Sequence, residues 1–227
     1  MVDQRKENYH YEEALKTLRT NIQFAGAEIT SILVTSCYPN EGKSDIVSQL
    51  AKEMGKAGKK VLLLDADIRK SAFIQRFQIE GEVKGLSQYL SGQVAVRDIL
   101  YTTNYANVDI IFAGPVAPNP SELLEGKLFA HLVEGLSQRY DYILIDTPPM
   151  ASVIDAAIVG GVCDGAILVI EDGTVGYRAA QKVKAPLEKS GSRVLGAVLN
   201  KVEMKKGKYY SYDKYGKYSK YGRYGKY

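Results

Sequence analysis

Six short apolar runs, separated by segments with helical periodicity, limit what this chain can fold into. The runs span residues 31–36, 60–67, 108–114, 141–146, 166–171 and 193–200. Such nearly continuous apolar runs are typical of strands that are buried on both faces of a parallel sheet. The segments between them predict helices over residues 44–57, 85–91, 121–139, 154–162 and 176–190. The alternation predicts a doubly wound α/β fold with a mostly parallel sheet, whose ligands bind at the carboxyl ends of the strands.

A further amphipathic helix is predicted ahead of the first strand, over residues 11–24. Its apolar residues Leu15, Leu18, Ile22 and Phe24 recur at roughly helical spacing. We therefore divide the chain into three parts. These are an N-terminal helix at 1–30, an α/β domain at 31–204 and a tail at 205–227.

The tail differs from the rest of the chain in composition. It contains eight of the chain's 17 tyrosines and no aliphatic residue. A segment that can bury so little apolar surface does not offset its ordering entropy, so we predict that it is disordered. A hydroxyl-bearing residue repeated on a disordered tail indicates a substrate that is presented many times. The predicted phosphorylation sites are Tyr209, Tyr210, Tyr212, Tyr215, Tyr218, Tyr221, Tyr224 and Tyr227.

Charge and composition exclude several classes of function. The tail has eight cationic side chains against Asp213 alone, whereas the whole chain is +4, so residues 1–204 are near −3. We therefore expect no nucleic-acid partner. The two cysteines match no metal-binding spacing and suit a reducing cytoplasm. No apolar stretch is long enough to span a bilayer and no signal peptide opens the chain, so any membrane role needs a partner.

The segment CYPNEGKS, residues 37–44, predicts a phosphate-binding loop because it follows a strand and opens a helix. Backbone N–H groups and the helix N-terminus favour an anion there, and a lysine and a hydroxyl at its end suit outer phosphates and Mg²⁺. Cys37 stands where the strict pattern has glycine. Asp45, in the first helical turn, is either a solvated N-terminal acid or a regulatory residue. The residues predicted to contact the nucleotide are Asn40, Glu41, Gly42, Lys43, Ser44 and Asp45.

Two further motifs place acidic residues at strand ends. Asp65 and Asp67 lie in LLLDADIR, and Asp146 lies in ILIDTPP. One such carboxylate is enough to hold Mg²⁺ in a phosphate-loop protein, so three exceed simple nucleotide binding. The extra carboxylate suits a general base that accepts a proton from an acceptor hydroxyl. The alternative is structural, with Asp65 capping the segment that follows it.

With these motifs in place, the chain resembles a bacterial tyrosine kinase of the capsule and exopolysaccharide type. That family is similar to the ParA/MinD branch of P-loop ATPases. The signatures are a Walker A loop, an apolar run with D-x-D-x-R (the A′ motif) and an apolar run with D-x-x-P (Walker B). They match Cys37–Ser44, Leu62–Arg69 and Ile143–Pro148. The early lysine that ParA and MinD relatives carry in the first motif is missing here.

The resemblance implies roles for individual residues. It implies that Lys43 and Ser44 hold phosphate and Mg²⁺, that Asp67 and Asp146 complete the metal site, and that Asp65 is the base. Arg69 of the A′ motif joins Asp65 and Lys43 as a predicted catalytic residue. The family's ring-forming E-x-x-R-x-x-R corresponds to Glu13, Lys16 and Arg19. Lysine at the second of these positions lacks the planar fork that pairs with a carboxylate, and the alternative is an ordinary charged helix surface.

Asn200 follows the last strand in an N-K-x-E sequence that resembles the guanine-reading N-K-x-D. Because the other motifs favour ATP, Asn200 is either a base contact or a polar strand end.

The predicted function is an ATP- and Mg²⁺-dependent protein tyrosine kinase that phosphorylates its own tail between subunits. The resemblance implies a homo-oligomeric ring, a transmembrane activator that regulates chain length, a tyrosine phosphatase and a role in capsular or exopolysaccharide synthesis and export. It places the protein in the cytoplasm, at the inner face of the membrane through its partner. The alternatives are a ParA/MinD-like positioning ATPase without kinase activity, and a module that binds single-stranded nucleic acid through its tail.

Overall fold

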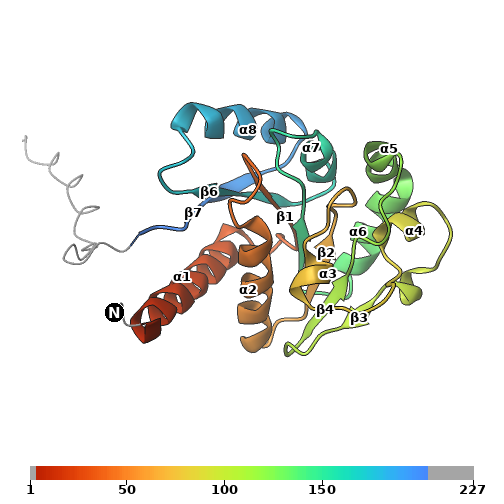
Figure 1. Ribbon diagram of the computed structural model, residues 1–227, viewed down its shortest axis with the longest axis horizontal. Coiled ribbons are helices and arrows are strands. Elements are labelled where there is room, and N and C mark those ends of the chain that lie inside the picture. The colour runs from red at the N-terminus through yellow and green to blue at the C-terminus, as the bar shows by residue number, and fades with distance from the viewer. Residues whose placement is uncertain (1–3, 204–227) are drawn as a thin grey trace, which may run out of the picture.

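The computed structural model describes residues 4–203; residues 1–3 and 204–227, with all eight tail tyrosines, lie outside the described part. A seven-stranded sheet with the order β3-β4-β2-β5-β1-β6-β7 forms the centre of the molecule (Figure 1). All neighbouring pairs are parallel except β3–β4. The strands are β1 Ser31–Ser36, β2 Val61–Asp65, β3 Tyr101–Thr102, β4 Val108–Ile111, β5 Tyr142–Asp146, β6 Gly165–Glu171 and β7 Val194–Asn200. The prediction of a doubly wound, mostly parallel sheet is confirmed.

Helices cover both faces of this sheet, which explains the uninterrupted apolar runs. On one face α1, α2 and α3 pack with residues such as Ile32 and Leu63. On the other face α4 to α8 pack with residues such as Leu33 and Leu64. The helices are α1 Gln4–Ala25, α2 Lys43–Lys56, α3 Phe73–Arg76, α4 Leu86–Leu90, α5 Pro120–Glu125, α6 Lys127–Ser137, α7 Asp155–Gly160 and α8 Tyr177–Lys189.

The structure differs from the predicted elements at a few points. The predicted helix over 121–139 is two helices, because Gly126 adopts an extended conformation with ψ of 149° between α5 and α6. Three short elements were not predicted, namely α3, the 3₁₀ turn Val96–Asp98 and β3. Phe24, predicted on the apolar face of the first helix, is 83% exposed, whereas Leu15 and Ile22 are buried.

Helix α1 packs against α2 on the same face of the sheet (Figure 1). The buried side chain of Ile22 joins the core there. Arg19 donates a hydrogen bond from Nη1 to Oε1 of Glu53 on α2, at 3.1 Å. No helix within residues 4–203 combines the length and the apolarity that crossing a bilayer requires.

The order of the strands brings three carboxyl ends together. Strand β5 lies between β1 and β2, and the ladder pairs Asp146 with both Val34 and Asp65. The motif-bearing loops that follow β1, β2 and β5 therefore emerge beside one another. Such a point, where successive strands diverge to opposite sides of the sheet, is where open α/β sheets bind ligands.

Candidate active site

The loop at 37–44 connects β1 to α2 and adopts a conformation that glycine makes possible. Gly42 precedes α2 with φ of 87°, in the left-handed region, and its carbonyl accepts the hydrogen bond from the Ile46 N–H. A Cβ atom on Gly42 would lie 2.2 Å from Nδ2 of Asn200. Both the backbone conformation and the lack of space therefore require glycine at this position. Cys37 is buried at the start of the loop, and burial raises the pKa of its thiol to about 11.

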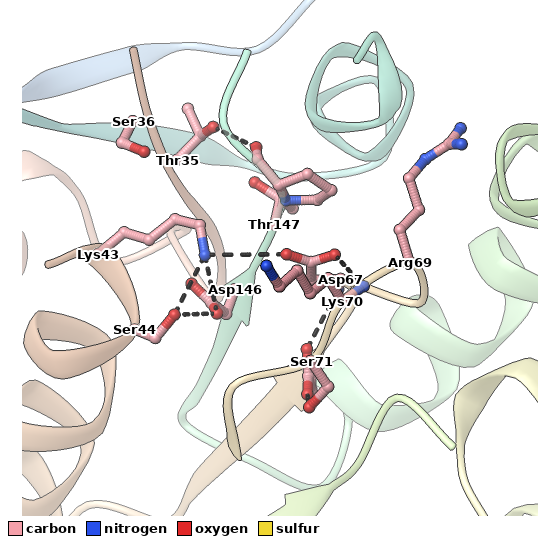
Figure 2. A network of polar contacts seen from close by, with 12 residues as sticks. Thr35, Ser36, Lys43, Ser44, Asp67, Arg69, Lys70, Ser71, Asp146 and Thr147 are labelled. Atoms are coloured by element: carbon pink, nitrogen blue, oxygen red, sulfur yellow. Dashed lines mark hydrogen bonds and ion pairs between the residues drawn. The ribbon is translucent and has the colours of Figure 1, made fainter. Parts of the chain in front are cut away.

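At the end of the loop, two side chains converge on the Walker B aspartate (Figure 2). The Ser44 hydroxyl donates to Oδ2 of Asp146 at 2.6 Å. The Lys43 ammonium lies 3.4 Å from the same oxygen and 3.1 Å from the Ser44 hydroxyl. Asp146 is 1% exposed, and its Oδ1 has no hydrogen-bond partner among the described residues. An unpartnered buried carboxylate oxygen is costly, so this atom indicates a cation or a water that belongs at the site.

The A′ motif places its two aspartates next to this cluster. Asp65 is fully buried. Its Oδ1 accepts from the Asp67 N–H at 3.1 Å and its Oδ2 accepts from the Ser71 hydroxyl. Asp67 Oδ1 accepts from the Lys70 N–H at 2.9 Å, while its Oδ2 lies 4.0 Å from the Lys43 ammonium.

Burial in this cluster disfavours negative charge. It raises the pKa of Asp65 to about 8, and the neighbouring charge of Asp146 adds to the effect. Burial also raises the pKa of Asp67 and of Asp146, although the Lys43 ammonium opposes the rise for both. Carboxyl groups crowded in this way bind protons or cations strongly.

The donor set fits Mg²⁺. Ser44, Asp67 and Asp146 supply only oxygen ligands, which is the preference of that ion. Within residues 4–203, no group of three or more carboxylate, imidazole or thiol side chains gathers to hold a metal. An ion at this position would complete its shell with water and phosphate, which is how Mg²⁺ is usually held.

Arg69 was predicted to be catalytic together with Lys43 and Asp65, but its side chain does not join their cluster. Its side chain is directed away from the cluster in Figure 2 and pairs with Asp155 at the start of α7. Nε and Nη2 lie 2.7 and 3.0 Å from the two oxygens of the Asp155 carboxylate, and Nη2 also donates to Ser121 at 2.8 Å. Asp155 is fully buried. These contacts of the Arg69 guanidinium hold the loop that follows β2, here called the A′ loop, against α5 and α7. Arg69 therefore anchors the A′ loop.

Asp45 is not a freely solvated acid. It pairs with Arg76, which ends α3, and so connects the first turn of α2 to that helix. Its side chain is 56% exposed and lines the same cavity as Lys43.

Asn200 and Lys201, at the end of β7, contact the phosphate loop itself. Asn200 Nδ2 donates to the Glu41 carbonyl at 2.9 Å, and Lys201 Nζ donates to the Asn40 carbonyl at 2.6 Å. The Asn200 amide thus braces the loop. Glu41 is also buried and accepts from the Tyr38 N–H at 3.0 Å.

The three residues predicted to form a ring lie away from this cluster, on α1. Lys16 pairs with Glu13 at 2.8 Å, and both side chains are about half exposed. Arg19 is directed to Glu53 on α2. Glu13 and Lys16 therefore present a charged surface, while Arg19 contacts the body of the domain.

A cavity of about 650 Å³ opens in front of these loops. Its lining contains the ends of all three motif loops, and it also includes Pro148, Pro149, Ser152 and Val153. Several functional neighbours escaped prediction, namely Ser71, Ser121, Asp155 and Lys201. Only Ser71 and Lys201 have a signal in the sequence, since Ser71 lies two residues after the A′ motif and Lys201 is the lysine of the N-K-x-E sequence.

Fold and site together define a P-loop NTPase, a nucleotide-binding protein with a phosphate loop between β1 and α2 and acidic residues at two further strand ends. Comparisons with known proteins agree. A family profile described as "AAA domain" matches residues 40–173. The chain is 42% identical over 201 residues to the tyrosine-protein kinase CpsD of Streptococcus agalactiae, covering 88% of each chain.

Solved structures give the same result. The kinase domain of the Escherichia coli tyrosine kinase ETK superposes with a TM-score of 0.82 at 34% identity, covering 88% of this chain and 79% of that one. The septum site-determining protein MinD of Pyrococcus horikoshii, solved with Mg-ADP, superposes with a TM-score of 0.65 at 26% identity over 75% of this chain and 70% of that one. The chain belongs to the bacterial tyrosine-protein kinases, and it is a protein-tyrosine kinase.

Proposed function

We propose that this protein uses Mg-ATP to phosphorylate the tyrosines of its own tail, one subunit acting on the tail of its neighbour. The observation that carries the proposal is the buried carboxylate of Asp65 beside the Lys43–Ser44–Asp146 cluster. A nucleotide hydrolase of this fold needs one acidic strand end for its metal. A second acid, held by Ser71, is available to accept a proton from an incoming hydroxyl.

The side chains of the site divide the work of transfer. Lys43 neutralises the outer phosphates, and the loop backbone with the N-terminus of α2 orients them. Ser44, Asp67 and Asp146 hold Mg²⁺, which supplies positive charge at the phosphates when it is bound. Asp65 accepts the proton of the tyrosine hydroxyl. The hydrogen bond from Ser71 favours the charged form of Asp65, which is the form that can take up that proton.

The connectivity of the chain supports transfer between subunits. The tail begins close to the end of β7, which is fastened to the phosphate loop of its own subunit. Presenting all eight tyrosines to the site beside which their own tail starts is harder than presenting them to the site of a neighbouring subunit. We propose that Glu13, Lys16 and Arg19 on α1 help to assemble the subunits into a ring.

The family also suggests a cellular setting. We propose control of capsular or exopolysaccharide synthesis and export from the cytoplasmic face of the membrane. Docking there requires a transmembrane activator, and resetting the tail requires a tyrosine phosphatase. Each phosphate adds about −1.5 to −2 charges, so about four phosphates cancel the tail's +7.

Substitution of Lys43 by Met tests the assignment. The change removes the cation at the outer phosphates, so we expect no autophosphorylation after incubation with Mg-ATP, measured by mapping phosphotyrosine. Lys182→Met, an exposed lysine on α8, is the matched control and should retain wild-type phosphorylation. Wild-type phosphotyrosine in Lys43→Met would contradict the proposal. ATP hydrolysis by the unaltered protein without any phosphotyrosine would favour a positioning ATPase.

A further inference from the structure

Five cationic side chains line the cavity in front of the phosphate loop. They differ in whether an acidic side chain pairs with them. They are Lys43, Arg69, Lys70, Arg76 and Lys201. Three of the five are paired with acids that belong to other parts of the fold. Arg69 pairs with Asp155, Arg76 with Asp45 and Lys201 with Glu171.

The remaining two cations are the lysines. Lys43 is shared between Asp146 and Asp67, as expected for the phosphate-loop lysine. Lys70 makes no ion pair and no side-chain hydrogen bond with any residue between 4 and 203. It is exposed, although it lies three residues from a buried carboxylate. Lys70 is therefore an exposed positive charge that lines the cavity and has no acidic partner among the described residues.

The backbone of the A′ loop determines where Lys70 points. Asp67 Oδ1 accepts the Lys70 N–H at 2.9 Å, while the adjacent Arg69 is held by Asp155. Figure 2 shows the result, since Arg69 is directed away from the cluster and Lys70 is directed toward Lys43 and Asp146. Anchoring the arginine thus presents the lysine to the cavity.

The site is rich in negative charge, which favours a second lysine near the transferred phosphoryl group. Asp65, Asp67 and Asp146 are all buried at one sheet edge. ATP brings further negative charge, and phosphoryl transfer spreads it over the equatorial oxygens of the moving group. The phosphate loop contributes a single lysine, because CYPNEGKS has none near its start.

We propose that Lys70 is a catalytic residue that contacts the transferred phosphoryl group and stabilises its charge in the transition state. The inference rests on the proposed kinase reaction. There, the tyrosine oxygen forms a bond to the γ-phosphorus, the bond from that phosphorus to the β-bridging oxygen breaks, ADP leaves and the hydroxyl proton passes to Asp65. Lys70 acts from the A′ side and Lys43 from the loop side. Arg69 and Asp155 are positioning residues for Lys70.

Substitution of Lys70 by Gln, with Lys70→Arg and Lys182→Gln beside it, tests the proposal in the full chain. Loss of a charge that acts only in the transition state should lower kcat by about 10²–10³-fold. The affinity for ADP should change by less than about threefold, because ground-state binding is retained. Lys70→Arg should recover much of the rate, and Lys182→Gln should match the wild type.

A second readout does not depend on turnover. Aluminium fluoride added to Mg-ADP mimics the transferring phosphoryl group, so it should tighten nucleotide binding in the wild type and not in Lys70→Gln, measured by displacement of fluorescent ADP. Wild-type kcat in Lys70→Gln, or an equal loss of ADP affinity, would overturn the proposal. If the wild type forms no phosphotyrosine, the kinase reaction is the part that fails, and the aluminium fluoride comparison still decides the role of Lys70.

Discussion

The burial of Asp65 determines the pKa of its carboxyl group and therefore its suitability as a base. Its carboxylate is fully buried between the A′ loop and Asp146, and burial together with that neighbour raises its pKa to about 8. A carboxyl group with a raised pKa is largely protonated near neutral pH and binds protons more tightly than an ordinary aspartate does. Such a group suits a base that must take a proton from a weakly acidic hydroxyl.

Asp65→Asn should therefore affect chemistry more than binding. We expect phosphotyrosine formation to slow by roughly 10²–10⁴-fold, the usual range for a general base. The affinity for ADP, measured by calorimetry, should remain close to that of the wild type. Asp172→Asn, an exposed aspartate after β6, provides the control. A loss of affinity as large as the loss of rate would instead make Asp65 part of the metal site.

At the scale of residues, the sequence predicted those contacts in which both partners belong to recognisable motifs. Lys43, Ser44 and Asp146 meet as their spacing at strand ends indicated. The pairing of Arg69 with Asp155 could not be predicted, because Asp155 belongs to no motif and nothing in either segment indicates the other. The same holds for Asp45 and Arg76.

Among the elements, α1 has charged side chains in two different surroundings. Glu13 and Lys16 face solvent, whereas Arg19 contacts Glu53 on α2. Arg19 and Glu53 are each largely buried, and Nε of Arg19 has no partner among the described residues. Removal of Arg19 would leave Glu53 without its charged partner from α1.

Substitutions on α1 should therefore separate assembly from stability. Glu13→Ala with Lys16→Ala should give smaller assemblies by light scattering and weaker autophosphorylation at low protein concentration, without a change in melting temperature. Arg19→Ala should also destabilise the fold, by about 1–3 kcal/mol, because a partly buried carboxylate loses its partner. Glu53→Gln distinguishes the two effects, since it breaks the same contact from α2. An unchanged mass for the Glu13/Lys16 variant would leave this surface without a role in assembly.

Strands were easier to predict than helices. The apolar runs located six strands to within a few residues, because burial on both faces leaves little sequence freedom. Helix breaks were harder, since Gly126 is compatible with a continuous helix and only its extended backbone ends α5. The two-residue strand β3 depends on its antiparallel pairing with β4, which no local pattern shows.

For the whole molecule, the tail and the body have opposite charge. The tail is +7 and the remainder of the chain is near −3, and the buried acids Asp65, Asp67 and Asp146 lie at the sheet edge behind the cavity, which Asp67 lines. We therefore expect an unmodified tail to dock at a neighbour's site. A phosphorylated tyrosine is repelled by those acids and has no hydroxyl left to give.

Phosphorylation should accordingly loosen the assembly. Sedimentation of the unmodified, the fully phosphorylated and the tail-deleted protein (ending at Met204) tests this expectation. The unmodified protein should sediment as the largest species, and the other two should shift toward monomer. A larger phosphorylated species would show that the tail does not connect subunits.

The class of fold was accessible from the sequence, but its arrangement was not. Alternation of strands and helices indicated a doubly wound sheet, yet the order that places β5 between β1 and β2 depends on packing across the whole domain. That order creates the site, because it pairs Asp65 with Asp146.

The bonds from Asn200 and Lys201 to the phosphate loop have a mechanical consequence. They fasten the loop at the carbonyls of Glu41 and Asn40, at the point where the chain leaves the sheet toward the tail. A pull on the tail is therefore transmitted to the phosphate loop before it strains the strands behind it. Tension applied through the tail would therefore alter the conformation of the phosphate loop and, with it, the affinity for ADP.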